Sequence, residues 1–430
     1  MTAEAEAEAK GDRRAVVAPP GRMRRLIAVV AVGSFATGLG WPISVGELSF
    51  NGLLKDQLKL SPHEVTAFWA VAGLSWYLKP LAGLITDAYP LFGTRRRGYM
   101  LWGTIVACLA WLGFVAIPPA LAPLLVLTTG LNVAIVFVSV AVSGLLVQTG
   151  QDYRATGLVS ALFTGIDAAV PLVTGYLAGW LASRAFGWTA VAGAVILGSF
   201  IPVVAFGYRE PAGARPDRRV WAAAKQNLRA IVGSRATWAA GILLFLIFFT
   251  PSFATPLYFY QRDVLRFSPQ LIGTLRTLGG AGGLIGAGLY SVVCRRLSLR
   301  TSLIAGVLIV VASNLLYLRY DSALAAVLID TTATFLGSLG VVPIYDLATR
   351  AIPKGSENFG FGLVIGIRNV AYFGVANNLG ALLYERHGFK PLVWISALTT
   401  LLVLPFIGLI PRPLLAAREG ERRRADAGRR

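Results

Sequence analysis

Five charged side chains lie well inside otherwise apolar runs, and they are the groups best placed to do chemistry: Lys79, Asp167, Arg276, Asp330 and Arg368. An ionised group in hydrocarbon costs about 2.5–3.5 kcal/mol by insertion scales, so each needs a partner or a water-filled cavity. Cations in a cleft of low dielectric favour an anionic ligand. Carboxylates whose surroundings change from wet to dry can take up and release protons. The set therefore predicts binding of an anionic small molecule, with protons as a second partner.

The composition shows what kind of structure must hold these charges. Of the 430 residues, 55% are hydrophobic and 14% are charged, whereas roughly a quarter of a soluble domain is charged. These values indicate a polytopic protein of the lipid bilayer. The net charge of +19 does not indicate a nucleic-acid partner, because the basic residues form short clusters between apolar runs. Cys108 and Cys294 are expected to be buried thiols rather than a disulfide.

Apolar runs interrupted by Pro, Gly and charge predict twelve spanning helices of about 20 residues or more. They cover residues 24–46, 64–88, 98–118, 121–149, 155–182, 187–208, 237–261, 268–294, 301–319, 322–350, 357–384 and 389–411. If the N-terminus is cytoplasmic, 29 of the 40 Lys and Arg residues fall on that side and 8 on the other. The positive-inside rule then places both termini, 1–23 and 412–430, in the cytoplasm of a multi-pass cell-membrane protein.

Two sequence echoes indicate an internal duplication. QLKLSP at 57–62 matches VLRFSP at 264–269, and residues 164–188 match 365–389 with nearly the same offset. Parallel six-helix halves related by an axis along the membrane normal define the major facilitator fold. We therefore expect an all-α membrane protein with bundles at 24–208 and 237–411, joined by a cytoplasmic linker at 209–236. Residues 221–232 of that linker have the pattern of an amphipathic helix at the inner leaflet.

Depth along each helix predicts how the charges meet. Arg276 and Asp330 each lie 8 residues from the outer start of their spans, so we expect an ion pair, either static or opened as the conformation changes. Asp167 and Arg368 hold equivalent places in the second echo, on opposite sides of a central cavity, with Lys79 near the depth of Arg368. Alternatively, Lys79 extends to the membrane surface and Asp167 pairs with a neighbouring helix. The predicted substrate-binding residues are Lys79, Arg368, Asn369 and Arg276, and the predicted proton-coupling residues are Asp167 and Asp330.

Three stretches of sequence carry a family resemblance: KPLAGLITDAYPLFGTRRRGY at 79–99, YFYQRDVLRFSPQLIGTLRTLGGAGGLIGAGLY at 258–290, and LATRAIPKGSENFGFGLVIGIRNV at 347–370. Together they resemble the folate–biopterin transporter family of the major facilitator superfamily, and the resemblance runs from the first span to the last. It implies a secondary active transporter with alternating access, which carries a small organic anion such as folate or a pterin by proton symport. We expect it to act as a monomer.

The first of these stretches also holds the expected gate. A Gly-rich helix end, an acid and a basic loop form the cytoplasmic connection between the second and third spans of facilitators generally. An Asp at the helix end can latch that loop in one conformation. The gating candidates are Gly83, Asp87, Arg95, Arg96, Arg97, Arg350 and Glu357.

The sequence departs from the family in span 121–149. Acidic residues are usual there in the family, and their positions fall on Ser139, Ser143 and Gln148. Asp167 is therefore the only acid at mid-depth in the N-terminal half and the best local proton carrier. These changes leave open a facilitator-type carrier of a different small solute.

Other residues give weaker indications. The sequence has no phosphate-binding loop and no cluster with metal-ligand spacing, so we expect no enzyme activity, catalytic residue, cofactor or metal. Tyr258, Phe259 and Tyr260 are expected in an interfacial belt, with a stacking platform as the alternative. Asn377 or Asn378 is expected to bond across helices. The competing function from another class is a non-transporting membrane receptor or scaffold.

Overall fold

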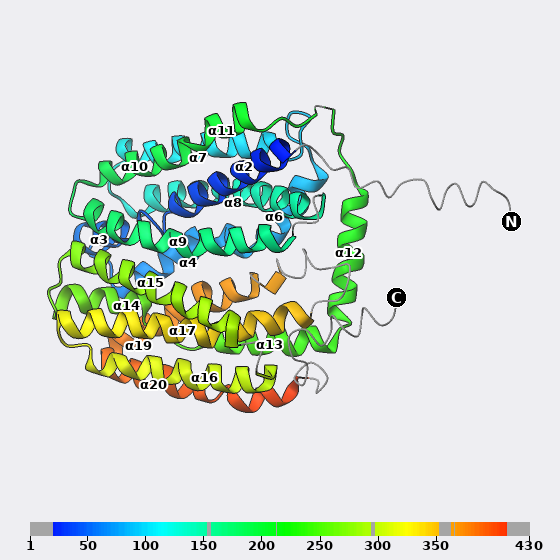
Figure 1. The fold of residues 1–430 in the computed structure, drawn as a ribbon. Coiled ribbons are helices and arrows are strands. Elements are labelled where there is room, and N and C mark those ends of the chain that lie inside the picture. Colours follow the sequence, from blue (N-terminus) through cyan, green and yellow to red (C-terminus); the bar gives the residue numbers. More distant parts are fainter. Residues whose placement is uncertain are drawn as a thin grey trace.

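The chain is helical throughout almost all of the part that a computed structural model describes, which is residues 20–152, 156–211, 213–293, 297–351, 363–364 and 366–410. Figure 1 shows two groups of roughly parallel helices, one built from the first half of the chain and one from the second. A single helix, α12 (Arg219–Val232), runs across one end of both groups. The predicted all-α fold is confirmed.

The N-terminal half holds the helices that precede α12. They are α2 (Pro20–Leu39), α3 (Glu47–Gly52), the π-helical turn η1 (Leu53–Gln57), α4 (Pro62–Ala72), α5 (Leu74–Tyr77), α6 (Lys79–Ala88), α7 (Arg97–Ala116), α8 (Leu121–Asp152), α9 (Thr156–Ala182), α10 (Phe186–Gly198) and α11 (Phe200–Gly207). The expected span 64–88 is divided at Gly73 and again before Pro80, because Gly favours a break and Pro lacks the N–H that an unbroken helix needs.

The C-terminal half follows α12. Its elements are α13 (Arg235–Phe249), α14 (Ala254–Phe259), the π-helical turn η2 (Tyr260–Val264), α15 (Pro269–Val293), α16 (Leu299–Leu316), the 3₁₀ turn η3 (Tyr317–Arg319), α17 (Ala323–Ala351), the π-helical segment η4 (Val370–Ala376), α19 (Asn377–His387), α20 (Phe389–Leu401) and the 3₁₀ turn η5 (Leu404–Leu409). The linker helix expected at 221–232 is confirmed as part of α12, which packs on α6 and α13.

By length and composition, seven helices in the described part of the chain are able to cross a membrane. Large apolar side chains face outwards from them, among them Val126, Leu324 and Phe206, whose exposed fractions are 73%, 71% and 85%. Such a surface suits lipid rather than water. The protein is therefore a multi-pass membrane protein, whereas the count of twelve spans stays a prediction because several of the expected spans are interrupted.

The two ends of the molecule are packed differently. We call the end that carries Pro20, α12 and Ile410 the terminal end, and the opposite end the distal end (Figure 1). At the distal end one hydrophobic core joins both halves. Its buried members include Phe50, Trp69, Tyr258, Ile272 and Phe389. At the terminal end each half has a core of its own, formed by residues such as Val138, Val142 and Phe200 in one half and Leu243, Leu303 and Leu347 in the other. The halves are thus fused distally and packed separately towards the chain ends.

Two helix pairs join the halves. Helix α9 packs on α15, and α4 packs on α19. Glycines allow the first pair to approach closely, since a Cβ built on Gly273 would lie 2.4 Å from the carbonyl oxygen of Gly175. The interfacial belt expected at residues 258–260 is wrong for Tyr258 and Phe259, because both side chains are buried in the shared core.

Gly273→Ala is expected to destabilise the folded protein by about 1–3 kcal/mol, because the added methyl forces α9 and α15 apart. A thermal unfolding scan in detergent measures the loss as a lower Tm. Gly130→Ala in α8 is the control, since its Cβ meets nothing within 4 Å. An unchanged Tm for Gly273→Ala would mean that the close approach does not matter for stability.

Candidate functional site

Two indole rings meet at the interface between the halves and are held by one buried amide. The Oδ1 atom of Asn132, on α8, accepts a hydrogen bond from Nε1 of Trp41 and another from Nε1 of Trp76, each 2.9 Å long. Its Nδ2 atom donates to the carbonyl oxygen of Thr128 at 3.0 Å. The two rings lie 4.6 Å apart between centroids. Because Asn132 is fully buried, its amide fixes both rings in place.

The C-terminal half continues this aromatic surface. Phe373 in η4 meets Trp41 edge to face, with 6.4 Å between ring centroids. Tyr372 lies beside Phe373 and also contacts Phe248 of α13. Aromatic side chains from both halves therefore line one region of the interface, where they can contact a flat ring on its face or at its edge.

The predicted cations Lys79 and Arg368 stand at the same aromatic surface. The Lys79 ammonium lies 5.1 Å from the Trp76 ring centroid and donates to the Ser139 hydroxyl at 3.0 Å. The Arg368 guanidinium lies 5.3 Å from the Phe248 ring centroid and 5.9 Å from that of Tyr372.

Arg368 is incompletely bonded by the protein. Its Nη1 atom donates to Asn369 at 3.3 Å, while its buried Nε atom has no hydrogen-bond partner. No described carboxylate lies within ion-pair distance of this guanidinium. A buried N–H group without a partner is costly, so a movement that exposes the Arg368 guanidinium would let this group bond to a ligand.

Two asparagines join the halves by hydrogen bonds. Asn369, which is buried, donates to the backbone carbonyl oxygen of Trp76 at 3.4 Å. Asn378 accepts a hydrogen bond from the Thr66 hydroxyl at 3.0 Å. The expectation that Asn378 bonds across helices is confirmed.

Arg276 does not form the ion pair with Asp330 that its depth predicts. Its guanidinium instead binds Glu47 of α3 through both nitrogen termini, with Nη2 and Oε1 2.9 Å apart. The prediction failed because Glu47 follows the end of α2 and belongs to the other half, so counting depth within one half could not find it. The Arg276–Glu47 pair joins the halves at their distal end.

Asp330 is bonded by tyrosines instead. Its carboxylate accepts hydrogen bonds from Tyr317 at 2.9 Å and from Tyr320 at 2.7 Å, and Tyr320 also accepts one from Gln261. Burial, and then the charge of Asp330, raises the pKa of Tyr320 above its ordinary value. Tyr320 therefore stays protonated and continues to donate to Asp330 near neutral pH.

The predicted gate lies at the terminal end. Arg96 and Asp87 approach to 3.8 Å, which confirms their proximity, and Arg96 also donates to Gln148. The sequence interpretation missed Glu210, whose carboxylate accepts the backbone N–H groups of residues 95, 96 and 97 at 2.8–3.1 Å. That carboxylate fixes the start of α7 at the favourable end of the helix dipole. Gly83 lies in α6 near Val140 of α8.

Three predicted residues lie where the structure says little or nothing. Asp167 belongs to α9 and Arg350 to α17, but their side chains are outside the described part, and Glu357 lies outside the described residues altogether. Their roles stay predictions. The sequence also gave no indication of Trp41, Trp76 and Asn132 as a unit, because Trp41 follows α2, Trp76 lies in α5 and Asn132 lies in α8, and only folding brings them together.

An all-helical membrane protein with two packed halves and a charged, aromatic site between them has the architecture of a secondary transporter. Residues 40–426 match the BT1 family, and the chain belongs to that family. It is 30% identical to the folate-biopterin transporter of a Synechocystis species, over 90% of this chain and 81% of that protein. It is 23% identical to folate transporter 1 of Plasmodium falciparum, over 75% of this chain and 66% of that protein.

Solved structures confirm the fold. The chain is similar to a D-xylose-proton symporter with a TM-score of 0.68 and 13% identity, over 90% of this chain and 98% of that one. It is similar to the nucleoside transporter NupG with a TM-score of 0.64 and 12% identity, over 89% of this chain and 98% of that one. The major facilitator fold and the transporter class predicted from sequence are therefore confirmed.

Asn132→Leu is expected to destabilise the protein by about 1–3 kcal/mol, because it leaves two indole N–H groups without an acceptor. It should also raise the KM for transport, since the released rings no longer hold one orientation. Thr129→Val is the matched control on α8, because the Thr129 hydroxyl bonds only to the carbonyl of Leu125. If Asn132→Leu matches this control in both Tm and KM, the amide does not position the rings.

Proposed function

We propose that this transporter alternates access to carry a small organic anion with a flat heterocycle, of the folate or pterin class, in symport with protons. One observation carries the proposal: two cations and a set of aromatic rings from both halves meet at one place on the interface. Lys79 and Arg368 supply positive charge there, and Trp41, Trp76 and Phe373 supply ring faces and edges.

The chemistry of the substrate class matches these groups. A pterin is a flat bicyclic ring that can stack on an indole, and a folate adds carboxylates that can accept charge-assisted hydrogen bonds. The Arg368 guanidinium, which has no described carboxylate partner, suits such a carboxylate once a movement of the halves exposes it. The names of the two relatives, a folate-biopterin transporter and a folate transporter, point to the same class.

Alternating access follows from the uneven packing of the two ends. The distal end is closed by the shared core, whereas the terminal end has a separate core in each half. Rocking one half against the other exchanges which end is closed. With the termini in the cytoplasm, the described conformation is the one that faces inwards.

Proton coupling is assigned to Asp167, with Asp330 as a second carboxylate. Asp167 holds the place in α9 that matches Arg368 in the duplicated half, so it lies at the depth of the site. Asp330 is bound to two tyrosine hydroxyls, which can stabilise its charged form or relay a proton. Arg276 joins the substrate site only in the state where its pair with Glu47 is open.

The cellular setting is proposed from the charge bias of the loops. We place the protein in the cell membrane as a monomer with both termini cytoplasmic, because 29 of the 40 Lys and Arg residues then lie on the cytoplasmic side. The Asp87–Arg96 contact is then a cytoplasmic latch.

Uptake by proteoliposomes tests the substrate and the coupling together. Folates, pterins and unrelated organic anions are offered with and without an inward pH gradient. The proposal predicts accumulation of a folate or pterin that depends on the gradient. Accumulation of unrelated solutes alone would reassign the substrate, and absence of any transport would favour a receptor or scaffold.

Arg368→Gln should weaken substrate affinity by about 10- to 150-fold, because one charge-assisted contact contributes roughly 1.5–3 kcal/mol. Asp167→Asn should retain binding but abolish accumulation driven by the pH gradient. Both variants are measured in one proteoliposome assay. Arg184→Gln is the control, because Arg184 lies in the distal loop after α9, over the ring of Trp180, and away from the proposed site. Wild-type affinity in Arg368→Gln removes the anion-site role, and wild-type accumulation in Asp167→Asn removes the proton role.

Cysteine labelling tests the orientation. Lys10→Cys and Ala427→Cys should both resist a membrane-impermeant thiol reagent applied to intact cells and should react after the cells are opened. Fast labelling of either site from outside would reverse the topology.

A further inference from the structure

Two charged dipeptides occupy equivalent places in the two halves. Lys55-Asp56 and Arg262-Asp263 are separated by the same offset as the QLKLSP and VLRFSP segments that follow them. Each pair therefore precedes the same Ser-Pro start of a helix. The duplication thus preserved a cation followed by an acid at both sites.

The backbone around the dipeptides is repeated as well. Both lie in a single π-helical turn, η1 in one half and η2 in the other. The π-type bonds from Leu58 N to Leu53 O and from Leu265 N to Tyr260 O are both 3.1 Å long. Lys59 and Arg266, four residues after each cation, share the unusual φ of +57°. Since π turns cost stability and gather at functional sites, their retention in both halves indicates a role for what they carry.

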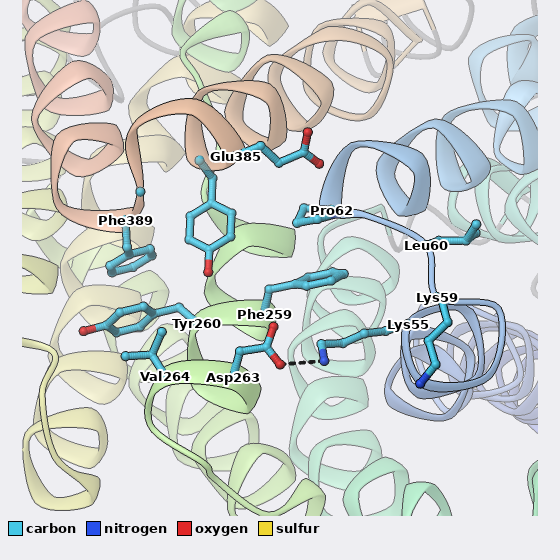
Figure 2. A pocket seen from close by; sticks show the side chains of 12 residues that line it. Lys55, Lys59, Leu60, Pro62, Phe259, Tyr260, Asp263, Val264, Glu385 and Phe389 are labelled. Atoms are coloured by element: carbon cyan, nitrogen blue, oxygen red, sulfur yellow. Dashed lines mark ion pairs between the residues drawn. The ribbon is translucent and has the colours of Figure 1, made fainter.

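The charges pair across the interface in a reciprocal way. Lys55 Nζ lies 2.6 Å from Asp263 Oδ1, and Arg262 Nη2 lies 3.6 Å from Asp56 Oδ2. Figure 2 shows the first of these pairs, with Lys55 reaching from one half to the acid of the other beside the Phe259 ring. Each half thus gives one cation and receives one, as a twofold axis between the halves requires.

The Lys55–Asp263 pair lies at the distal end, where it lines an open hollow of about 620 Å³ together with Lys59, Tyr384 and Glu385. The Arg262–Asp56 pair lies next to it, because Asp56 is also within 3.5 Å of Lys55. Beneath them the shared core closes the interface. Every ion pair that joins the halves within the described residues lies at this end, including Glu47–Arg276. Charge pairing is therefore concentrated where the halves must separate for the opposite end to close.

We propose that Lys55, Asp56, Arg262 and Asp263 form a reciprocal clasp, and that these four positioning residues set how often the distal end opens. The clasp acts on the substrate site through the positions of the two halves and touches no substrate itself. It rests on the alternating access of the proposed function and is independent of the substrate.

The exposure of the clasp fits a gate that must open in each cycle. Both acids are 48% exposed, while Lys55 and Arg262 are 17% and 27% exposed. Ion pairs at such exposure shift an equilibrium only about 1.4- to 5-fold each. Rocking about the twofold axis breaks both pairs in the same movement, so their effects combine without locking the gate.

A spin-label distance across the distal end reports the gate directly. Labels are placed at Ser183→Cys and Asp321→Cys, in exposed distal loops of opposite halves, after Cys108 and Cys294 have been replaced by Ala. Pulsed dipolar spectroscopy of the full-length protein in lipid nanodiscs then gives the populations of short and long distances. No substrate is needed, so a negative uptake screen does not affect the distance measurement. Equally, an unchanged distance distribution does not affect the proposed substrate class.

Charge reversal should shift these populations in a pattern that only the reciprocal pairing predicts. Asp263→Lys should raise the long-to-short ratio at least fivefold, and Lys55→Asp combined with Asp263→Lys should restore it. Lys55→Asp combined with Arg262→Asp should instead give a raised ratio, because that variant gathers four acids. A wild-type distribution in Asp263→Lys, or no restoration by the matched swap, would overturn the clasp.

Neutral variants keep the test valid if a reversal prevents folding. Lys55→Gln should raise the long-to-short ratio about two- to fivefold. Lys59→Gln is the matched control, since Lys59 is an exposed cation two residues beyond the same π-helical turn and forms no ion pair with a described residue. Equal effects of the two variants would show that net charge, not pairing, governs the distal end.

Discussion

The partly buried ion pair between Glu47 and Arg276 is the interaction on which the arrangement of the two halves depends. It joins α3 to α15 at the distal end, directly above the shared hydrophobic core. Removing one partner of a buried pair typically costs about 3–5 kcal/mol, because the other charge is left without compensation. The halves can therefore separate distally only if water enters to solvate both groups. The conformation with a closed distal end is thus stabilised, and the proposed substrate site is then reached from the terminal end.

The site itself depends on that arrangement because both halves contribute to it. Asn132 fixes Trp41 and Trp76 on one side, and Phe373 of η4 and Arg368, just before η4, lie on the other. A rocking movement at the distal end changes the spacing between these two sets. The proposed substrate contacts and the distal ion pairs are therefore coupled through rigid helices, without any need for local unfolding.

Much of the fold was accessible from sequence, because apolar run length and internal repetition are local signals. The facilitator resemblance implied that the fifth span meets the eighth and the second meets the eleventh, and the contacts of α9 with α15 and of α4 with α19 are both present. The partner of Arg276 was not accessible, since Glu47 lies just after the first expected span, in a segment punctuated by Gly and Pro, and belongs to the other half. The indole pair was missed because two of its three residues look like ordinary core residues until Asn132 joins them.

Alternating exposure of the site is the central claim, and the accessibility of Ser139→Cys on α8 tests it most directly. Ser139 accepts a hydrogen bond from Lys79 within the site. In a background without other cysteines, an impermeant thiol reagent should label it rapidly from the terminal face of oriented vesicles and slowly from the distal face. Replacing Glu47 and Arg276 together by Ala should raise the distal rate. Two results would contradict the account. One is rapid labelling from the distal face alone while Glu47 and Arg276 are intact, and the other is an unchanged distal labelling rate when both are replaced by Ala.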